Sequence, residues 1–590
     1  MPVSDVVTWD LESLFPGGFE GTRWAEKLSW VEARVGGIVA EADALGDPTT
    51  DDRWDTVLPA LERLSKVAGS LFAYAHCRTA DDVADAEGNK AVARLGGIWA
   101  RISRAWTNPE QRIARADDET FAALCARPAL AEQVPRFVDM RATSHLLLPA
   151  GEQALLAELS EPAVGAWSRL YDRVSGGLRA TVGGEDMSVG QAFNRLDNPD
   201  PAVRAGAFAG MRGAWEPVLD QCADILGNLT QTRLVVSGRL DVEPIAIPLA
   251  THRMERATLD AMIGFCRDDA RPLMHRYLQA KARALGGERL DYWDVRAPMG
   301  GDGTRWDWGR AQDFIIEQFG TFSSELADFA RRCFAEGWVE AEDRSGKRQG
   351  AFCIPFREFD QSRVFMTWSG TTTNLITLAH ELGHAWHNEV MWDLPAAKAR
   401  VPSTLAESAS TFAEAVVRGA ALKQARGNEK AELALLESDL QAATVMLVNI
   451  PTRMLFEQSL FEDRARGPLD AAVLSERVGA LQREWYGPAL GEPNRFFWAA
   501  KLHFYLQRSF YNYPYTFGYL FSSLIHARAV AEGPAWAPSY TALLRETGAG
   551  PAEGVAERHL GVNLRQKKAW MPILADLEVK VARYEQLVSR

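Results

Sequence analysis

Two histidines and a glutamate are the first residues of this sequence whose types and spacing could do chemistry. Residues 380–384 read His-Glu-Leu-Gly-His, so His380 and His384 are four residues apart. On a helix this spacing places both imidazoles on one face, as two ligands of a single tetrahedral metal ion require. Glu381 adjoins the first histidine, where its carboxylate can take a proton from a water activated by that metal. The alternative interpretation is a surface helix with two solvated histidines.

A catalytic zinc site also needs a third protein ligand. A third histidine in the pattern HExxHxxGxxH is excluded, because the sequence has His387 and Val390 where that pattern has Gly and His. Glu407 and Glu414 are seven residues apart, so they would share a helix face. Glu407 could instead form a capping box with Thr404 at a helix N-terminus. Spacing alone therefore leaves the third ligand open.

A second group of candidate residues lies near the C-terminus. Residues 501–526 contain His503 and five of the twelve tyrosines of the chain. Acyl-transfer reactions pass through a tetrahedral oxyanion, which an imidazole N–H or a phenol O–H can stabilise. The alternative is that most of these rings line the core or a groove.

The elements that must position these residues are predicted to be mainly helical. Apolar residues recur at three- and four-residue spacing in segments such as 23–45, 258–285 and 430–465. The helix with the histidine pair is predicted to begin after the capping residues 371–374 and to end before Pro395.

A small β element is predicted next to that helix. Residues 363–368 are rich in β-branched and aromatic side chains and precede the helix-start signal. We expect this strand to lead into the helix, and it could pair with an extended peptide by strand addition.

Length and composition indicate a large globular protein. The chain has 590 residues, 47% of them hydrophobic and 24% charged, which excludes the disordered and collagen-like classes. A formal net charge of −13 disfavours nucleic acid as a partner, because phosphate binding relies on clustered Lys and Arg. A Gly- and Pro-rich stretch at about 175–201 predicts an N-terminal helical lobe, 1–190, and a catalytic domain, 191–590.

The predicted location is the cytoplasm, with no membrane partner. The first residues carry no basic and apolar leader, and no uninterrupted apolar run reaches about 18 residues. Six cysteines lie far apart without CxxC pairs, as in proteins with reduced, mostly buried thiols. A metal must then be held by histidine and carboxylate side chains.

Two motifs together resemble a known family. HELGHAWH at 380–387, followed by PSTLAESASTFAE at 402–414, is similar to the M3 family of zinc metallopeptidases, specifically its oligoendopeptidase F branch. Residues 8–15, 201–216 and 290–300 look like further pieces of that family.

The resemblance implies a fold, a cofactor and a set of site residues. The fold would be a large multi-helix body of two lobes around a deep substrate channel, with the small β element next to the zinc helix. One Zn²⁺ per chain would be held by His380, His384 and Glu407, with Glu381 as the general base. Glu414 becomes a candidate to orient a ligand imidazole. The family also implies a histidine and tyrosines near the oxyanion, which His503 and Tyr515 match best.

The resemblance further implies a zinc-dependent endopeptidase that cleaves internal bonds of short unstructured oligopeptides. One alternative is a dipeptidyl carboxypeptidase or carboxypeptidase on the same scaffold, with Arg400, Arg495 or Arg508 capturing the terminal carboxylate. The other is a non-catalytic peptide-binding protein, which the presence of Glu381 disfavours because zinc binding alone does not need that carboxylate.

Overall fold

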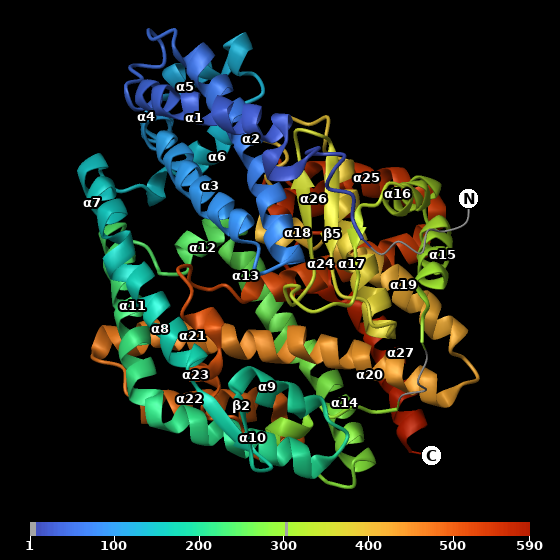
Figure 1. Ribbon diagram of the computed structural model, residues 1–590. Helices are drawn as coiled ribbons and strands as arrows, with labels where there is room; N and C mark the ends of the chain where they lie inside the picture. The colour runs from blue at the N-terminus through green and yellow to red at the C-terminus, as the bar shows by residue number, and fades with distance from the viewer. Residues whose placement is uncertain (1–7, 301–304, 590) are drawn as a thin grey trace. The chain divides into compact units, whose positions relative to one another are not determined.

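The computed structural model describes residues 8–300 and 305–589, which are mainly α-helical, as predicted (Figure 1). They form two compact units, each built from three separated stretches of chain. The first unit is Met1–Leu147, Thr304–Ala420 and Ile525–Leu560, and the second is Leu148–Gly303, Ala421–Leu524 and Gly561–Arg590. The division into an N-terminal lobe, 1–190, and a catalytic domain, 191–590, stays a prediction. The bounds of the two compact units differ from that division.

The first unit opens with three long helices that pack against one another: α1 (Thr22–Asp43), α2 (Trp54–Asp81) and α3 (Ala86–Ala105). Figure 1 shows them in blue. Its other helices are α4 (Thr107–Arg115), α5 (Asp118–Cys125), α6 (Val134–Ala142), α15 (Trp308–Gly320), α16 (Ser324–Ala335), α17 (Thr372–Glu389), α18 (Ser403–Ala406), α19 (Ser410–Gln424, to Ala420), α25 (Ala537–Glu546) and α26 (Ala552–Leu560).

A three-stranded sheet supports this unit, in the order β3-β5-β4. The strands are β3 (Val339–Glu340), β4 (Phe352–Phe356) and β5 (Gln361–Phe365). β5 runs parallel to β3 and antiparallel to β4. The predicted strand is confirmed, although it begins at Gln361 and ends at Phe365. Because β5 is the central strand, our expectation that it pairs with a substrate is wrong, and β3 and β4 are the edge strands.

The first described residues of the chain complete the core beside this sheet. The Asp10 N–H donates to the Gly337 carbonyl oxygen at 2.6 Å, and the fully buried Arg363 of β5 donates from Nε to the Asp10 carbonyl oxygen at 3.0 Å. Trp9 packs on Phe365 with ring centroids 5.6 Å apart. One apolar cluster therefore joins the N-terminal helices to the sheet that precedes the helix with the histidine pair.

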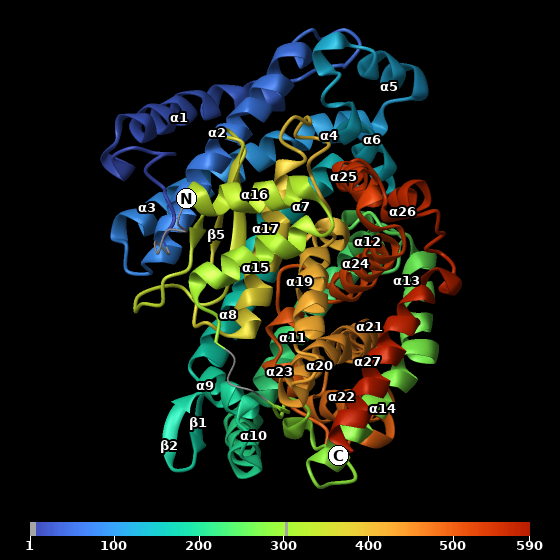
Figure 2. The same cartoon turned by 90° about the vertical axis from the view of Figure 1, so that its right-hand side faces the viewer.

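The second unit is also helical. Its helices are α7 (Ala150–Ser160), α8 (Ala166–Gly176), α9 (Val189–Asn194), α10 (Pro201–Trp215), α11 (Leu219–Arg239), α12 (Ala246–Thr251), α13 (Arg256–Phe265), α14 (Arg271–Ala284), α20 (Glu429–Thr444), α21 (Ile450–Arg466), α22 (Ala471–Tyr486), α23 (Phe497–Ala500), the first part of α24 (Tyr513–Glu532) and α27 (Pro572–Val588). A hairpin of β1 (Arg179–Val182) and β2 (Glu185–Ser188) lies beside α10, as Figure 2 shows.

The long helical run of this unit accommodates a proline. A π-turn, Val445–Asn449, joins α20 to α21, and Pro451 stands in the first turn of α21, where its missing N–H costs little. The run Glu429–Arg466 is long and apolar enough to cross a membrane, but half of its most apolar window is buried within the protein. α20 packs on α27 and α21 packs on α11, which is the position of a core helix.

Candidate metal centre

The helix that carries the histidine pair begins at a closely fitted turn. The Thr371 hydroxyl accepts from the Asn374 N–H at 3.1 Å, and the Asn374 side chain closes the reciprocal capping box. Gly370 adopts a positive φ of 71°, and a Cβ there would lie 2.9 Å from the Trp306 carbonyl oxygen. The predicted start and end of this helix are confirmed, because α17 runs from Thr372 to Glu389.

Three side chains converge within the first unit, and they are the three that the family resemblance implies. His380 Nε2 and His384 Nε2 are 3.1 Å apart, and Glu407 Oε2 lies 3.4 Å from the former and 3.3 Å from the latter. Atoms bound to a tetrahedral zinc ion at 2.0–2.1 Å lie about 3.3 Å from one another. The spacing and the chemistry of these donors therefore fit a divalent metal of the zinc type.

A glycine inside the motif makes this convergence possible. A Cβ on Gly383 would lie 2.6 Å from Ser410 Cα and 2.7 Å from the Ala409 carbonyl oxygen. The backbones of α17 and α19 therefore approach at a distance that only glycine permits. Sequence reasoning did not single out Gly383, although a glycine in the middle of a helix is a signal of close packing.

Glu407 is held outside a helix interior. It is the C-cap residue of the short α18 and precedes α19, so the capping-box interpretation is wrong and the shared helix face with Glu414 is not formed. The Ser410 hydroxyl donates to Glu407 Oε2 at 2.7 Å. This bond fixes the carboxylate that faces the two imidazoles.

Glu414 orients His380 by a contact with Nδ1, the ring nitrogen that does not face the other two side chains. Its Oε1 lies 2.6 Å from His380 Nδ1, and its Oε2 accepts from Arg418 at 2.9 Å. A carboxylate in this position keeps the proton on Nδ1, so that Nε2 presents its lone pair to the site. Sequence reasoning named Glu414 but missed Arg418, four residues further on the same helix.

The site is rich in negative charge. Burial raises the pKa of Glu407, but the hydrogen bond from His384 and the charges of both histidines outweigh it and lower the pKa to about 2. Burial lowers the pKa of His380, but Glu414 and the neighbouring carboxylates raise it to about 9. A cluster that draws a proton this strongly also favours a cation in its place.

One carboxylate oxygen of the cluster has no protein partner. Glu381 is 5% exposed, and its Oε2 is buried without a hydrogen-bond partner among the described residues. Burial raises the pKa of Glu381, against the charges of His380 and His384. A buried, unsatisfied carboxylate beside a donor set of this kind is what a general base for a bound water requires.

His387 has a structural position. It is buried, and its Nε2 lies 2.8 Å from the Thr547 hydroxyl. Burial lowers the pKa of His387 to about 4, so the ring is neutral. This histidine ties α17 to the segment between α25 and α26, and it is not among the three converging side chains.

The second group of candidate residues clusters in the second unit. The rings of His503 and Tyr515 stack with centroids 6.1 Å apart, and Tyr511 lies 5.1 Å from His503. Asn512, which sequence reasoning did not name, contacts His503 Nδ1 through Oδ1 at 2.8 Å. The structure thus brings His503 and Tyr515 together and adds a buried amide beside them.

Other candidates lie apart from these clusters. Arg495 pairs with Glu476 at 2.8 Å on the surface of the second unit, which leaves it a poor candidate for carboxylate capture.

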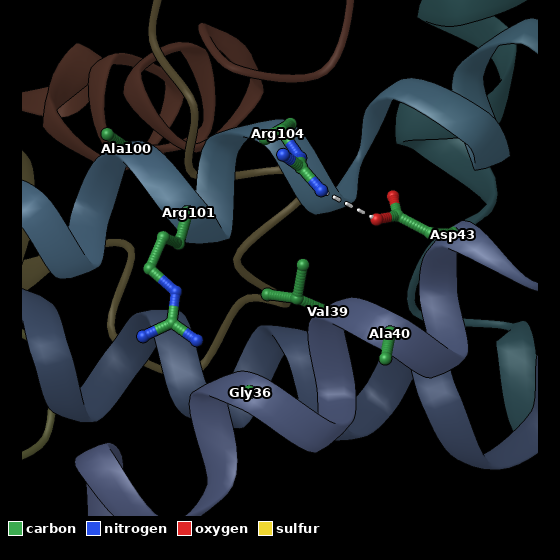
Figure 3. A pocket seen from close by; sticks show the side chains of 7 residues that line it. All are labelled: Gly36, Val39, Ala40, Asp43, Ala100, Arg101 and Arg104. Carbon is green, nitrogen blue, oxygen red and sulfur yellow. Dashed lines mark hydrogen bonds and ion pairs between the residues drawn. The ribbon is translucent and has the colours of Figure 1, made fainter.

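The first unit also has a cavity of about 440 Å³ between α1 and α3. Figure 3 shows that an ion pair between Arg104 and Asp43, at 3.1 Å, borders it. None of the predicted site residues lines this cavity. The six cysteines are free thiols, most of them buried.

Comparison with known families identifies the class of protein. Residues 321–572 match Peptidase family M3, and residues 112–179 match Oligopeptidase F, which together make up more than half of the chain. The chain belongs to peptidase family M3 and is a metallo-oligopeptidase, a hydrolase. Within that family it is of the oligoendopeptidase F type.

Individual relatives are distant in sequence but similar over most of their length. Oligoendopeptidase F, plasmid, of Lactococcus lactis subsp. cremoris is 21% identical over 602 residues, covering 100% of this chain and 98% of the relative. Oligopeptidase PepF of Bacillus subtilis is 22% identical, covering 89% and 79%. The crystal structure of oligoendopeptidase-F from Enterococcus faecium matches with a TM-score of 0.70 at 18% identity, covering 96% of this chain and 99% of that one. A crystal structure from Chlamydophila abortus gives a TM-score of 0.84 at 18% identity over 99% of both chains. These likenesses establish the fold.

Proposed function

We propose that this protein is a zinc-dependent endopeptidase that hydrolyses internal bonds of short, unstructured oligopeptides. The observation that carries the proposal is the convergence of His380 Nε2, His384 Nε2 and Glu407 Oε2 at 3.1–3.4 Å, beside the unpartnered Oε2 of Glu381. The names of the relatives, oligoendopeptidase and oligopeptidase, support the substrate class. We further propose that the enzyme is soluble and cytoplasmic, with neither membrane nor nucleic acid as a partner.

His380, His384 and Glu407 would hold one zinc ion per chain. A bound zinc ion supplies Lewis acidity, which lowers the pKa of a water and polarises the scissile carbonyl group. Glu414 accepts a hydrogen bond from the Nδ1–H of His380 and keeps that ring in the ligand tautomer.

Glu381 moves the proton of the reaction. Its Oε2 takes a proton from the attacking water as the new C–O bond forms at the scissile carbon. The same oxygen then gives this proton to the leaving amine as the C–N bond breaks. One water is consumed. One of its protons reaches the leaving nitrogen through Glu381 and the other stays on the new carboxyl group until that group ionises, so the products at neutral pH are a carboxylate and an ammonium group. The raised pKa of Glu381, caused by burial, suits a group that must hold a proton between these two steps.

We also propose, from the family resemblance, that His503 and Tyr515 contact the peptide substrate. A phenol O–H near the reacting carbonyl can donate a hydrogen bond to the oxygen on which negative charge develops. β4 is an edge strand of the three-stranded sheet, so we propose it, in place of β5, as the strand to which an extended peptide adds.

The test is mapping of cleavage products by mass spectrometry, with unstructured peptides of several lengths and zinc-loaded protein. We expect internal cuts that stop when a chelator is added and return with zinc. Cuts confined to one terminus would instead support a carboxypeptidase or dipeptidyl carboxypeptidase.

Glu381→Gln separates catalysis from binding. It should keep zinc content unchanged and reduce kcat by at least a thousandfold, since the proton acceptor is lost. Glu389→Gln is the matched control and should cleave normally. Glu389 lies on the same helix, where it pairs with Arg332 at 2.6 Å and accepts a hydrogen bond from the Trp392 indole N–H at 3.2 Å, and it is not among the converging side chains. Full activity of Glu381→Gln would refute the assigned role, and no cleavage by the unmodified protein would favour a peptide-binding function.

A further inference from the structure

We infer that Asn512 and Arg453 hold His503 in the tautomer that is protonated on Nδ1, so that its Nε2 accepts a hydrogen bond from the peptide substrate. The inference rests on the proposed function, in which His503 contacts the peptide. It reverses the direction of the hydrogen bond that the sequence suggests, where His503 donates an N–H to the oxyanion. Asn512 is then a positioning residue, and His503 is the group that touches the substrate.

The contacts of Asn512 determine which way its amide points. Asn512 is fully buried, and its Oδ1 lies 3.4 Å from Arg453 Nη1 and 2.8 Å from His503 Nδ1. A guanidinium group can only donate hydrogen bonds, so the amide oxygen and not the amide nitrogen must face Arg453. The same oxygen faces His503.

The orientation of the amide determines the state of the imidazole. An oxygen acceptor next to Nδ1 requires that Nδ1 carry a proton. A neutral imidazole has only one N–H, so Nε2 then keeps its lone pair. Burial lowers the pKa of His503 to about 4, and the charges of Lys501 and Arg453 act in the same direction against the opposing hydrogen bond with Asn512. Near neutral pH the ring therefore has no second proton to donate from Nε2.

The surroundings of His503 keep both the amide and the ring in place. Arg453 is 9% exposed and lies over the Phe497 ring, 5.4 Å from its centroid. The loop before Asn512 is anchored by the Phe510 N–H, which donates to Glu457 Oε1 at 2.6 Å, and Phe510 adopts a positive φ of 52°. Such backbone strain persists only where the surroundings determine the conformation.

Aromatic rings restrict rotation of the imidazole. Tyr511 meets the ring of His503 edge-on at 5.1 Å, and Tyr515 stacks on it at 6.1 Å. A flip of the ring, which exchanges Nδ1 with Cδ2 and Nε2 with Cε1, would break the contact with Asn512 and disturb this packing. The consequence for substrate binding is that Nε2 of His503 can accept a hydrogen bond from a backbone N–H of the peptide.

The direct test is the tautomer of His503 in zinc-loaded protein at neutral pH, measured by NMR of ¹⁵N-labelled histidine rings. The signals of His503 are those that disappear in His503→Gln. We expect Nδ1 to be protonated and Nε2 to be bare. A ring protonated on Nε2, or on both nitrogens, would overturn the inference. This measurement uses no substrate, so it stands or falls independently of the peptidase activity.

A variant tests the consequence for the reaction. Asn512→Asp keeps an acceptor for Nδ1 but adds a negative charge, which raises the pKa of His503. Below that new pKa the ring is protonated on both nitrogens and Nε2 becomes a donor, so kcat/KM should fall at least tenfold and recover at higher pH. The pH profile of the unmodified enzyme should lack this ionisation. A kcat/KM that holds or rises below the new pKa would show that His503 acts as a donor. Asn228→Asp, which adds the same charge at an exposed position of the second unit, is the control.

Discussion

Replacement of Glu414 by glutamine tests how far the metal site depends on a residue that is not a ligand. In the structure, Glu414 Oε1 lies 2.6 Å from His380 Nδ1, and Oε2 accepts from Arg418 at 2.9 Å. Glutamine has nearly the same shape and keeps one oxygen that can accept from Nδ1. It removes the negative charge that polarises the imidazole and that neutralises Arg418.

The expected effect is a loss of metal affinity. Changes at residues that orient a ligand histidine typically cost 10- to 100-fold in metal affinity or activity, which corresponds to about 1.4–2.8 kcal/mol. We expect Glu414→Gln near the lower end, because an acceptor remains. Glu414→Leu should reach the upper end, because it removes the acceptor and leaves the largely buried Arg418 without this partner.

The assay is competition for zinc against a chromophoric chelator, combined with kcat at saturating zinc. Glu389→Gln, on α17 with the same chemical change, is the control and should bind zinc as the unmodified protein does. Zinc affinity of Glu414→Gln within twofold of the unmodified value, with unchanged kcat, would refute the reasoning that His380 depends on this carboxylate.

Two further predictions concern stability. Gly383→Ala should lower the free energy of unfolding by about 1–3 kcal/mol and reduce zinc content, because its Cβ would meet Ser410 Cα at 2.6 Å. The control is Gly419→Ala, whose Cβ meets nothing within 4 Å and which should be neutral or stabilising in thermal unfolding. Equal thermal midpoints for the two variants would contradict the close approach of the backbones at Gly383. Burial raises the pKa of Glu457 to about 7 from an ordinary 4.5, against Arg233 and the Phe510 N–H. The folded protein keeps this proton to higher pH than the unfolded chain, so its contribution to stability is complete below about 4.5 and is lost, by about 3 kcal/mol, as the pH rises to about 7. Glu457→Gln should flatten that part of the profile of thermal midpoint against pH, and an unchanged slope would mean that Glu457 does not titrate there.

The local part of the metal site could be predicted from the sequence, because it depends on helical spacing. His380 and His384 must share a face of one helix, and Thr371 and Asn374 mark where that helix begins. The third ligand could not be read from spacing. Glu407 lies outside α19, and what brings it to the histidines is the backbone contact at Gly383, a tertiary feature that leaves only a single glycine in the sequence.

The contacts of His503 and the division of the chain were harder to predict, because they too depend on tertiary structure. The partner of His503 is Asn512, nine residues further along a loop that includes a positive φ at Phe510, and such a loop has no periodicity to read. Gly- and Pro-rich stretches mark turns, but they do not reveal that distant segments return to the same compact unit. The position of β5 in the centre of its sheet likewise depends on the short β3, which has only two residues.

The unit with the proposed metal ligands is built from three stretches of chain, Met1–Leu147, Thr304–Ala420 and Ile525–Leu560. Its folding must therefore close two long loops, and contacts of such large sequence separation form slowly because loop closure costs entropy first. During synthesis, Trp9 and the helices behind it must wait for the strand residue Phe365 before their shared core can form. Apolar surface of the early helices is exposed during that interval, which makes the nascent chain a candidate for chaperone binding. The same interleaving means that truncation after Ala420 would remove Ile525–Leu560 from the metal unit, although every metal ligand would remain in the chain.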